Sequence, residues 1–144
     1  MALREIADAL AQAVQAVDVT ELQVVPRLAV NPTPPTIDIY PADPSQEDAA
    51  FGPFSSLTHW TVRARVTTVD HDANQDILLD LLEPYGSTSV RAAVLADKTL
   101  GGLAEGMDVD RPSGMTVYPA LEGTASYLGC EWRVRIYTNG GPVG

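Results

Sequence analysis

Cysteine and histidine are scarce in this sequence of 144 residues. Cys130 is the only cysteine, so no disulfide can form within the chain, which suits a reducing compartment. The two histidines, His59 and His71, lie far from Cys130 in the sequence. These three residues are too few and too scattered to supply the ligands of a structural zinc site.

Long hydrophobic runs and basic residues are also in short supply. No apolar segment approaches the roughly 20 residues that a membrane-spanning helix needs, and no charged-then-apolar leader opens the chain. We therefore expect a protein that is neither membrane-bound nor exported. Nine Lys and Arg against 19 Asp and Glu leave a net charge of -10. Such a surface repels phosphates, which argues against nucleic-acid binding but lets DNA pass close by without sticking.

Complete catalytic and ligand-binding motifs are missing as well. The segment Asp70–Asn74 begins like a calcium loop, but Gln75 and Leu81 occupy the positions where that loop requires Gly and Glu. No G-x-S-x-G is present, and no G-x-G-x-x-G follows a strand. Cys130 falls among apolar residues, a setting that makes a thiol inert. We expect no catalytic residue, no cofactor and no bound metal.

Hydrophobic residues make up 45% of the chain, enough for the core of a single domain spanning 1–144. Apolar residues at helical spacing predict an amphipathic helix over Ala2–Val17. Acidic residues at Asp70–Asp72 favour the start of a second helix, which Pro84 ends. Ser87 or Thr88 is expected to cap a short third helix, and the pair Gly101-Gly102 indicates a chain reversal.

Alternating apolar and polar residues predict strands, most clearly over Trp60–Thr68 and Tyr127–Tyr137. Hairpin-length connections in the last third favour antiparallel pairing. We therefore predict an α+β fold with one mostly antiparallel sheet and two or three helices packed on one face. Trp60 and Trp132 are expected to meet in the core between them. Further strands are predicted near Leu22–Val25, Ile37–Tyr40, Met107–Asp110 and Met115–Leu121.

The segment 41–56 is rich in proline, glycine and acidic residues and is predicted to be a long loop. Arginine recurs on the polar faces of the two clearest strands, and neighbouring strands would crowd four guanidinium groups onto one face. Those groups would pair with carboxylates of the same chain or, alternatively, with the acidic loop of a neighbouring subunit. The candidate interface residues are Arg63, Arg65, Arg133, Arg135, Asp43, Glu47 and Asp48.

Several segments follow one another in a recognisable order: a short first helix, a strand, a helix ended by proline, a further short segment, a Leu-Gly-Gly turn and a long last strand. They are Leu3–Val17, Trp60–Val66, Leu78–Pro84, Ser89–Ala93, Thr99–Gly102 and Tyr127–Tyr137. In this order the chain resembles the tail terminator (tail completion) proteins of long-tailed bacteriophages.

The resemblance implies a structural virion protein rather than an enzyme. Such proteins form a ring, usually a hexamer, at the head-proximal end of the tail tube and are assembled in the host cytoplasm. Their partners are further copies of themselves, the tail tube protein and a neck or head-completion protein. The ring stops tube polymerisation and offers the surface that joins the capsid neck, while DNA passes through without specific binding. A head-to-tail ring uses two different patches on each subunit.

Two alternatives remain open at this point. A neighbouring neck component, such as a head-completion or stopper protein, would have a similar size. A small enzyme or ligand-binding α+β domain would need a pocket, for which His59, His71 and Tyr85 are the candidate lining residues.

Overall fold

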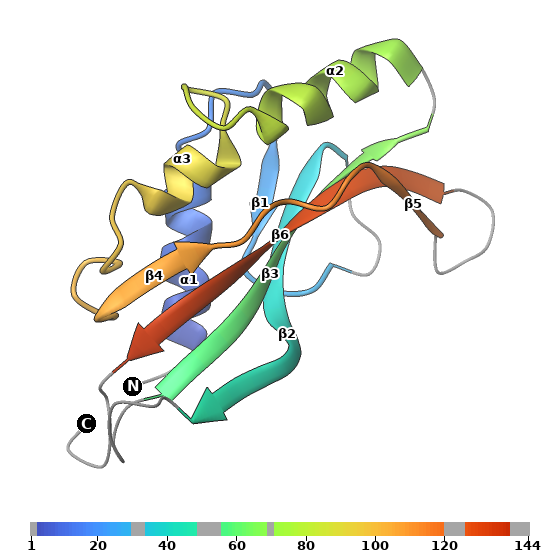
Figure 1. Cartoon of the computed structure of the whole chain (residues 1–144). Helices are drawn as coiled ribbons and strands as arrows, with labels where there is room; N and C mark the ends of the chain where they lie inside the picture. Colours follow the sequence, from blue (N-terminus) through green and yellow to red (C-terminus); the bar gives the residue numbers. More distant parts are fainter. Residues whose placement is uncertain (1–2, 30–33, 49–55, 69–70, 120–125, 139–144) are drawn as a thin grey trace.

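The computed structural model describes residues 3–29, 34–48, 56–68, 71–119 and 126–138. These residues form three helices and six strands in an α+β arrangement (Figure 1). The helices are α1 (Leu3–Val14), α2 (His71–Leu82) and α3 (Val90–Leu95). The strands are β1 (Gln23–Val25), β2 (Thr36–Asp48), β3 (Ser56–Thr67), β4 (Gly106–Val109), β5 (Thr116–Pro119) and β6 (Ser126–Thr138).

The six strands form one sheet in the order β1-β2-β3-β6-β4, and β5 also pairs with β6. Only the β1–β2 pair is parallel; β2–β3, β3–β6, β4–β6 and β5–β6 are antiparallel. The prediction of a mostly antiparallel sheet with helices on one face is therefore confirmed. β2, β3 and β6 have 13, 12 and 13 residues, about twice the usual strand length. They form the long central ribbon of the molecule (Figure 1).

The hydrophobic core lies between this sheet and the three helices. The apolar stripe predicted for the first helix is its buried face, which includes Ile6, Leu10 and Val14. In β3 and β6 alternate side chains point into the core, as the period of a strand requires. Trp60 lies opposite Val134 and Trp132 opposite Val62, so the two tryptophans occupy neighbouring strands of the same core. The buried sheet residues are Ile37, Ile39, Trp60, Val62, Ala64, Val66, Cys130, Trp132, Val134 and Ile136.

Helix ends follow the local sequence with two corrections: α1 ends at Val14 rather than at Val17, and the cap of α3 is not one of the predicted residues. α2 ends at Leu82, two residues before Pro84, as expected from a residue that cannot continue a helix. α3 is capped by Ser89 rather than by Ser87 or Thr88. The hydroxyl of Ser89 accepts a hydrogen bond of 3.0 Å from the backbone N–H of Ala92, which is the N-cap geometry.

The predicted loop over 41–56 is wrong for residues 41–48, which belong to β2. Backbone pairing with β3 resumes at Gln46, opposite Thr58, after an irregularity that begins at Pro41. Prolines are tolerated here because β1 pairs only with Thr36–Asp38, so the rest of β2 is an edge among the described strands. An edge residue can lack an N–H without breaking a ladder. Residues 49–55 lie outside the described part of the chain.

Candidate functional site

The β3–β6 pairing brings the four predicted arginines to the sheet face that is turned away from the helices. Arg63 lies opposite Glu131 and Arg65 opposite Gly129. Arg133 and Arg135 follow further along β6, opposite Thr61 and His59. The expectation that these strands are neighbours is therefore confirmed, and the remaining question is which carboxylates the guanidinium groups meet.

Asp38, on β2, is the carboxylate that binds two of them. Arg63 donates to it from Nε at 3.1 Å and from Nη2 at 2.7 Å, and Arg65 donates from Nη2 at 3.1 Å. The backbone N–H of Ala29 adds a bond of 3.0 Å, and the Ala29 carbonyl accepts one of 2.7 Å from Arg65. Asp38 is 0% and Arg65 4% exposed, so this is a buried ionic cluster in which charge-assisted bonds replace water.

Three tyrosines line the same cluster. The guanidinium of Arg63 lies 5.0 Å from the ring centre of Tyr40 and 5.3 Å from that of Tyr118, and Arg65 lies 5.5 Å from that of Tyr127. These distances are within the range of cation–π attraction. The strands β2, β3, β5 and β6 are thereby tied together across one face.

The pKa shifts follow from burial and from Asp38. Burial lowers the pKa of Arg65, and nearby Arg63 lowers it further. Burial also acts to lower the pKa of Arg63, but the hydrogen bonds and charge of Asp38 outweigh it and raise that pKa. Burial raises the pKa of Tyr118, and its hydrogen bond of 2.9 Å to Glu131 raises it further. Asp38 therefore stabilises the charge of Arg63, whereas burial and the neighbouring Arg63 oppose the charge of Arg65.

The other two arginines differ from each other. Arg135 pairs with Asp110 at 3.0 Å and approaches Asp108 at 3.9 Å, both within the chain. Arg133 is exposed, and no ion pair is found for it in the described residues. Three of the four arginines therefore follow the intrachain alternative. The side chains of the proposed acidic donors, Asp43, Glu47 and Asp48, lie outside the described residues, so their pairing with a neighbouring subunit stays a prediction.

Asp38 was not singled out from the sequence, although a signal was present. It is an acidic residue between Ile37 and Ile39, both of which are fully buried. An aspartate at the polar position of such a strand needs a cation on a neighbouring strand. The neighbour could be identified only once the β2–β3 register, which places Asp38 opposite Arg63, was known.

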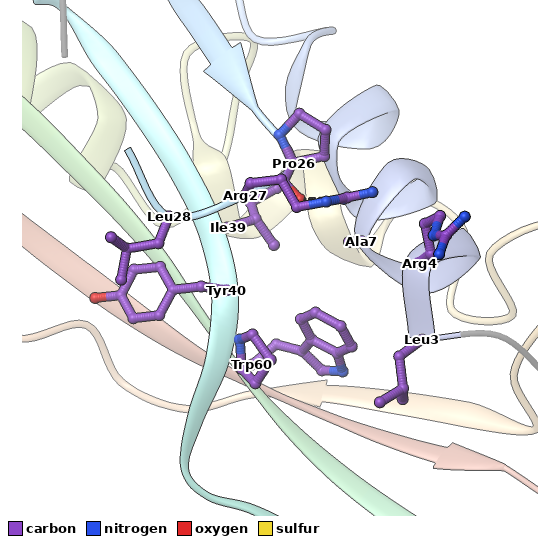
Figure 2. A pocket seen from close by; sticks show the side chains of 10 residues that line it. Leu3, Arg4, Ala7, Pro26, Arg27, Leu28, Ile39, Tyr40 and Trp60 are labelled. Atoms are coloured by element: carbon purple, nitrogen blue, oxygen red, sulfur yellow. Dashed lines mark hydrogen bonds between the residues drawn. The ribbon is translucent and has the colours of Figure 1, made fainter. Parts of the chain in front are cut away.

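A groove opens beside the cluster, where residues 39–41 of β2 face the first turn of α1. Its volume is about 430 Å³. Figure 2 shows Leu3 and Arg4 on one side, Leu28 and Tyr40 on the other, and Trp60 between them. Leu3 is 41% and Leu28 54% exposed, so the rim of the groove is apolar. The lining residues are Leu3, Arg4, Ala7, Pro26, Arg27, Leu28, Ile39, Tyr40, Pro41 and Trp60.

Of the residues considered for chemistry from the sequence, His59 and Tyr85 do not converge, and the side chain of His71 lies outside the described part of the structure. His59 lies near the start of β3, eight strand positions before its end, whereas Tyr85 follows α2 and is 77% exposed. Within the described ranges, no three His, Cys, Asp or Glu side chains gather where they would hold a metal ion. Cys130 is buried, and burial raises the pKa of its thiol to about 12.

Among the described helices, none is long and apolar enough to cross a membrane. No protein-family model matches this chain, and no curated protein is found as a relative of it. The groove, the exposed apolar side chains and the buried ionic cluster are therefore the features on which a function can be argued.

Proposed function

We propose that this protein is a structural component of a phage tail that forms a ring at the head-proximal end of the tail tube. In this role it ends tube polymerisation and presents the surface to which the capsid neck attaches. It acts through shape and surface chemistry, by docking copies of itself and a tube end. The proposal starts from the resemblance between the order of segments in this sequence and that of tail terminator proteins.

The observation that carries the proposal is where the exposed apolar side chains lie. Leu3 and Leu28 border the groove at the start of α1, and Leu79 and Tyr85 lie on or just after α2. In Figure 1, α2 and the start of α1 lie at opposite ends of the sheet. Two different apolar patches at opposite ends are what a head-to-tail ring requires, since each subunit gives one patch and receives the other.

The long strands and the net charge add support. A sheet whose central strands are cross-linked by the Asp38 cluster is a stiff element on which ring contacts can be built. A surface with net charge -10 repels the DNA that must pass through such a ring. Both properties suit a passage that has to hold its shape while a polyanion moves along it.

The decisive experiment adds the purified protein to polymerising tail-tube subunits of a long-tailed phage and measures tube lengths by electron microscopy. A terminator caps tube ends, so tubes stop growing and ring-shaped density is found at one end. A native mass measurement on the protein alone is expected to show several subunits per particle at high concentration. Tubes that grow unchanged, with rings that bind a neck or head-completion protein instead, would transfer the assignment to a stopper protein.

A further inference from the structure

The groove beside α1 combines apolar walls with positive charge. Arg4 and Arg27 both line it, so it holds two of the nine basic residues of an acidic chain. Nη1 of Arg27 donates to the Pro26 carbonyl and forms a 3.4 Å ion pair with Asp8, but the Arg27 side chain is 53% exposed and stays within reach of a partner. Arg4 is exposed, and no ion pair is found for it within the described ranges. A segment that fills this groove must therefore offer both apolar side chains and carboxylates.

The outer face of α2 offers that combination. Leu78 and Leu81 are buried against the sheet, which leaves the opposite side of the helix in solvent. On that side four exposed carboxylates surround Leu79, which is 52% exposed, and no Lys or Arg occurs between residues 71 and 90. Tyr85, just beyond the helix, is 77% exposed. The exposed carboxylates are those of Asp72, Asp76, Asp80 and Glu83.

We propose that the α1 groove of one subunit receives the acidic outer face of α2 from a second copy of this chain. Leu79 and Tyr85 enter the apolar part of the groove, and the α2 carboxylates meet Arg4 and Arg27. This inference rests on the proposed function, because it names the two surfaces that would join neighbouring subunits of the ring.

Charge complementarity selects a second copy as the occupant. The groove is basic and the helix face acidic, so each patch is repelled by its own kind and attracted by the other. In Figure 1, α2 lies apart from the start of α1, so a subunit cannot place its own α2 in its own groove. The contact is therefore heterologous, and repeating it leads from one subunit to the next.

Complementary charge reversals test the contact. Arg4→Glu places a negative charge beside Arg27 in the groove, and Asp80→Lys places a positive charge among the carboxylates of the α2 face. Both should preserve the fold, since a negative charge in the first turn of α1 and a positive charge in the last turn of α2 suit the helix dipoles. For each variant alone, the dissociation constant of self-association should be roughly tenfold higher than that of the wild type. The reason is that the substitution turns attraction into repulsion at more than one exposed contact.

Mixing the two variants in equal amounts supplies the sharpest readout. In an assembly of alternating variants, each contact joins either the two native side chains or the two substituted ones, and in both cases the charges are opposite. The dissociation constant of the mixture should therefore lie within about threefold of that of the wild type. Analytical ultracentrifugation or native mass spectrometry measures this directly. Arg111→Glu and Glu105→Lys are the matched controls, because both residues are exposed and lie outside the two patches. They change the net charge by the same amount and should leave the assembly unchanged.

The apolar part of the contact has its own test. Tyr85→Ser should weaken association by roughly tenfold or more, as truncating a buried tyrosine anchor does at protein interfaces. Val117→Thr is the control, because Val117 is 61% exposed on β5, outside both patches. If the wild type forms rings that Arg4→Glu, Asp80→Lys and Tyr85→Ser leave unchanged, or if the mixed variants fail to associate, this interface is refuted while the proposed function stands. A wild type that stays monomeric, with or without tail tubes, refutes both.

Discussion

Replacing Asp38 with asparagine is the most direct perturbation of the fold. Asparagine keeps the shape of the side chain but removes the negative charge. Arg63 and Arg65 would then be left side by side, with Arg65 only 4% exposed and without its carboxylate. One arginine N–H would also face the amide NH2 of the new side chain, which is a donor, where the wild type has a carboxylate oxygen.

The expected loss follows from the burial of the cluster. Removing one partner of a buried ion pair costs about 3–5 kcal/mol, because the remaining charge stays out of water. A domain of this size has a free energy of unfolding of about 5–15 kcal/mol. Asp38→Asn should therefore remove about a fifth or more of the stability. Asp108→Asn, at the exposed and longer contact with Arg135, should cost less than about 1 kcal/mol.

Urea unfolding followed by tryptophan fluorescence measures both variants, since Trp60 and Trp132 are buried in the folded state. With a slope of about 2 kcal/mol per M urea, Asp38→Asn should lower the midpoint by about 2 M without changing the slope. A triple variant with Asp38→Leu, Arg63→Met and Arg65→Met removes all three charges. It should be more stable than Asp38→Asn, because no unpaired charge is left in the sheet. This account of the cluster is refuted if Asp38→Asn is as stable as the wild type, or if the triple variant is less stable than Asp38→Asn.

Three further predictions concern residues of β5 and β6. Gly129→Ala should lower the free energy of urea unfolding by more than about 2 kcal/mol, because the new Cβ would collide with the backbone carbonyl of Ala64. Gly106→Ala should lower it much less, because there is open space around its Cβ. Equal losses in the two variants would contradict this reason. Cys130, with a pKa of about 12, should resist thiol-alkylating reagents at pH 8 until urea unfolds the chain. The raised pKa of Tyr118 keeps its phenol protonated in the folded state above pH ~10 while the unfolded chain ionises. Its contribution to stability is therefore complete below about pH 10 and is lost as pH rises, so Tyr118→Phe should flatten the fall of the urea midpoint above pH 10.

The sequence determined the elements because their signals are local. Helical spacing placed α1, Pro84 ended α2, and alternation placed β3 and β6, since each pattern depends only on which faces of a segment are apolar. Grouping the arginines on one sheet face also followed from alternation. The loop prediction was wrong over residues 41–48, because the backbone pairing of this strand with β3 does not depend on the side chains that suggested a loop.

Only the tertiary structure decided which elements pair and which of their side chains meet. The sequence places Asp38, Arg63 and Gly129 on different strands, and only the register of β2, β3 and β6 joins the first two in an ion pair and sets Gly129 under the stem of Arg65. The groove likewise needs α1, the segment after β1 and the free edge of β2 to meet. Local patterns specify faces, whereas pairing partners are chosen by contacts between residues far apart in the chain, and those contacts set both the charge cluster and the docking surface.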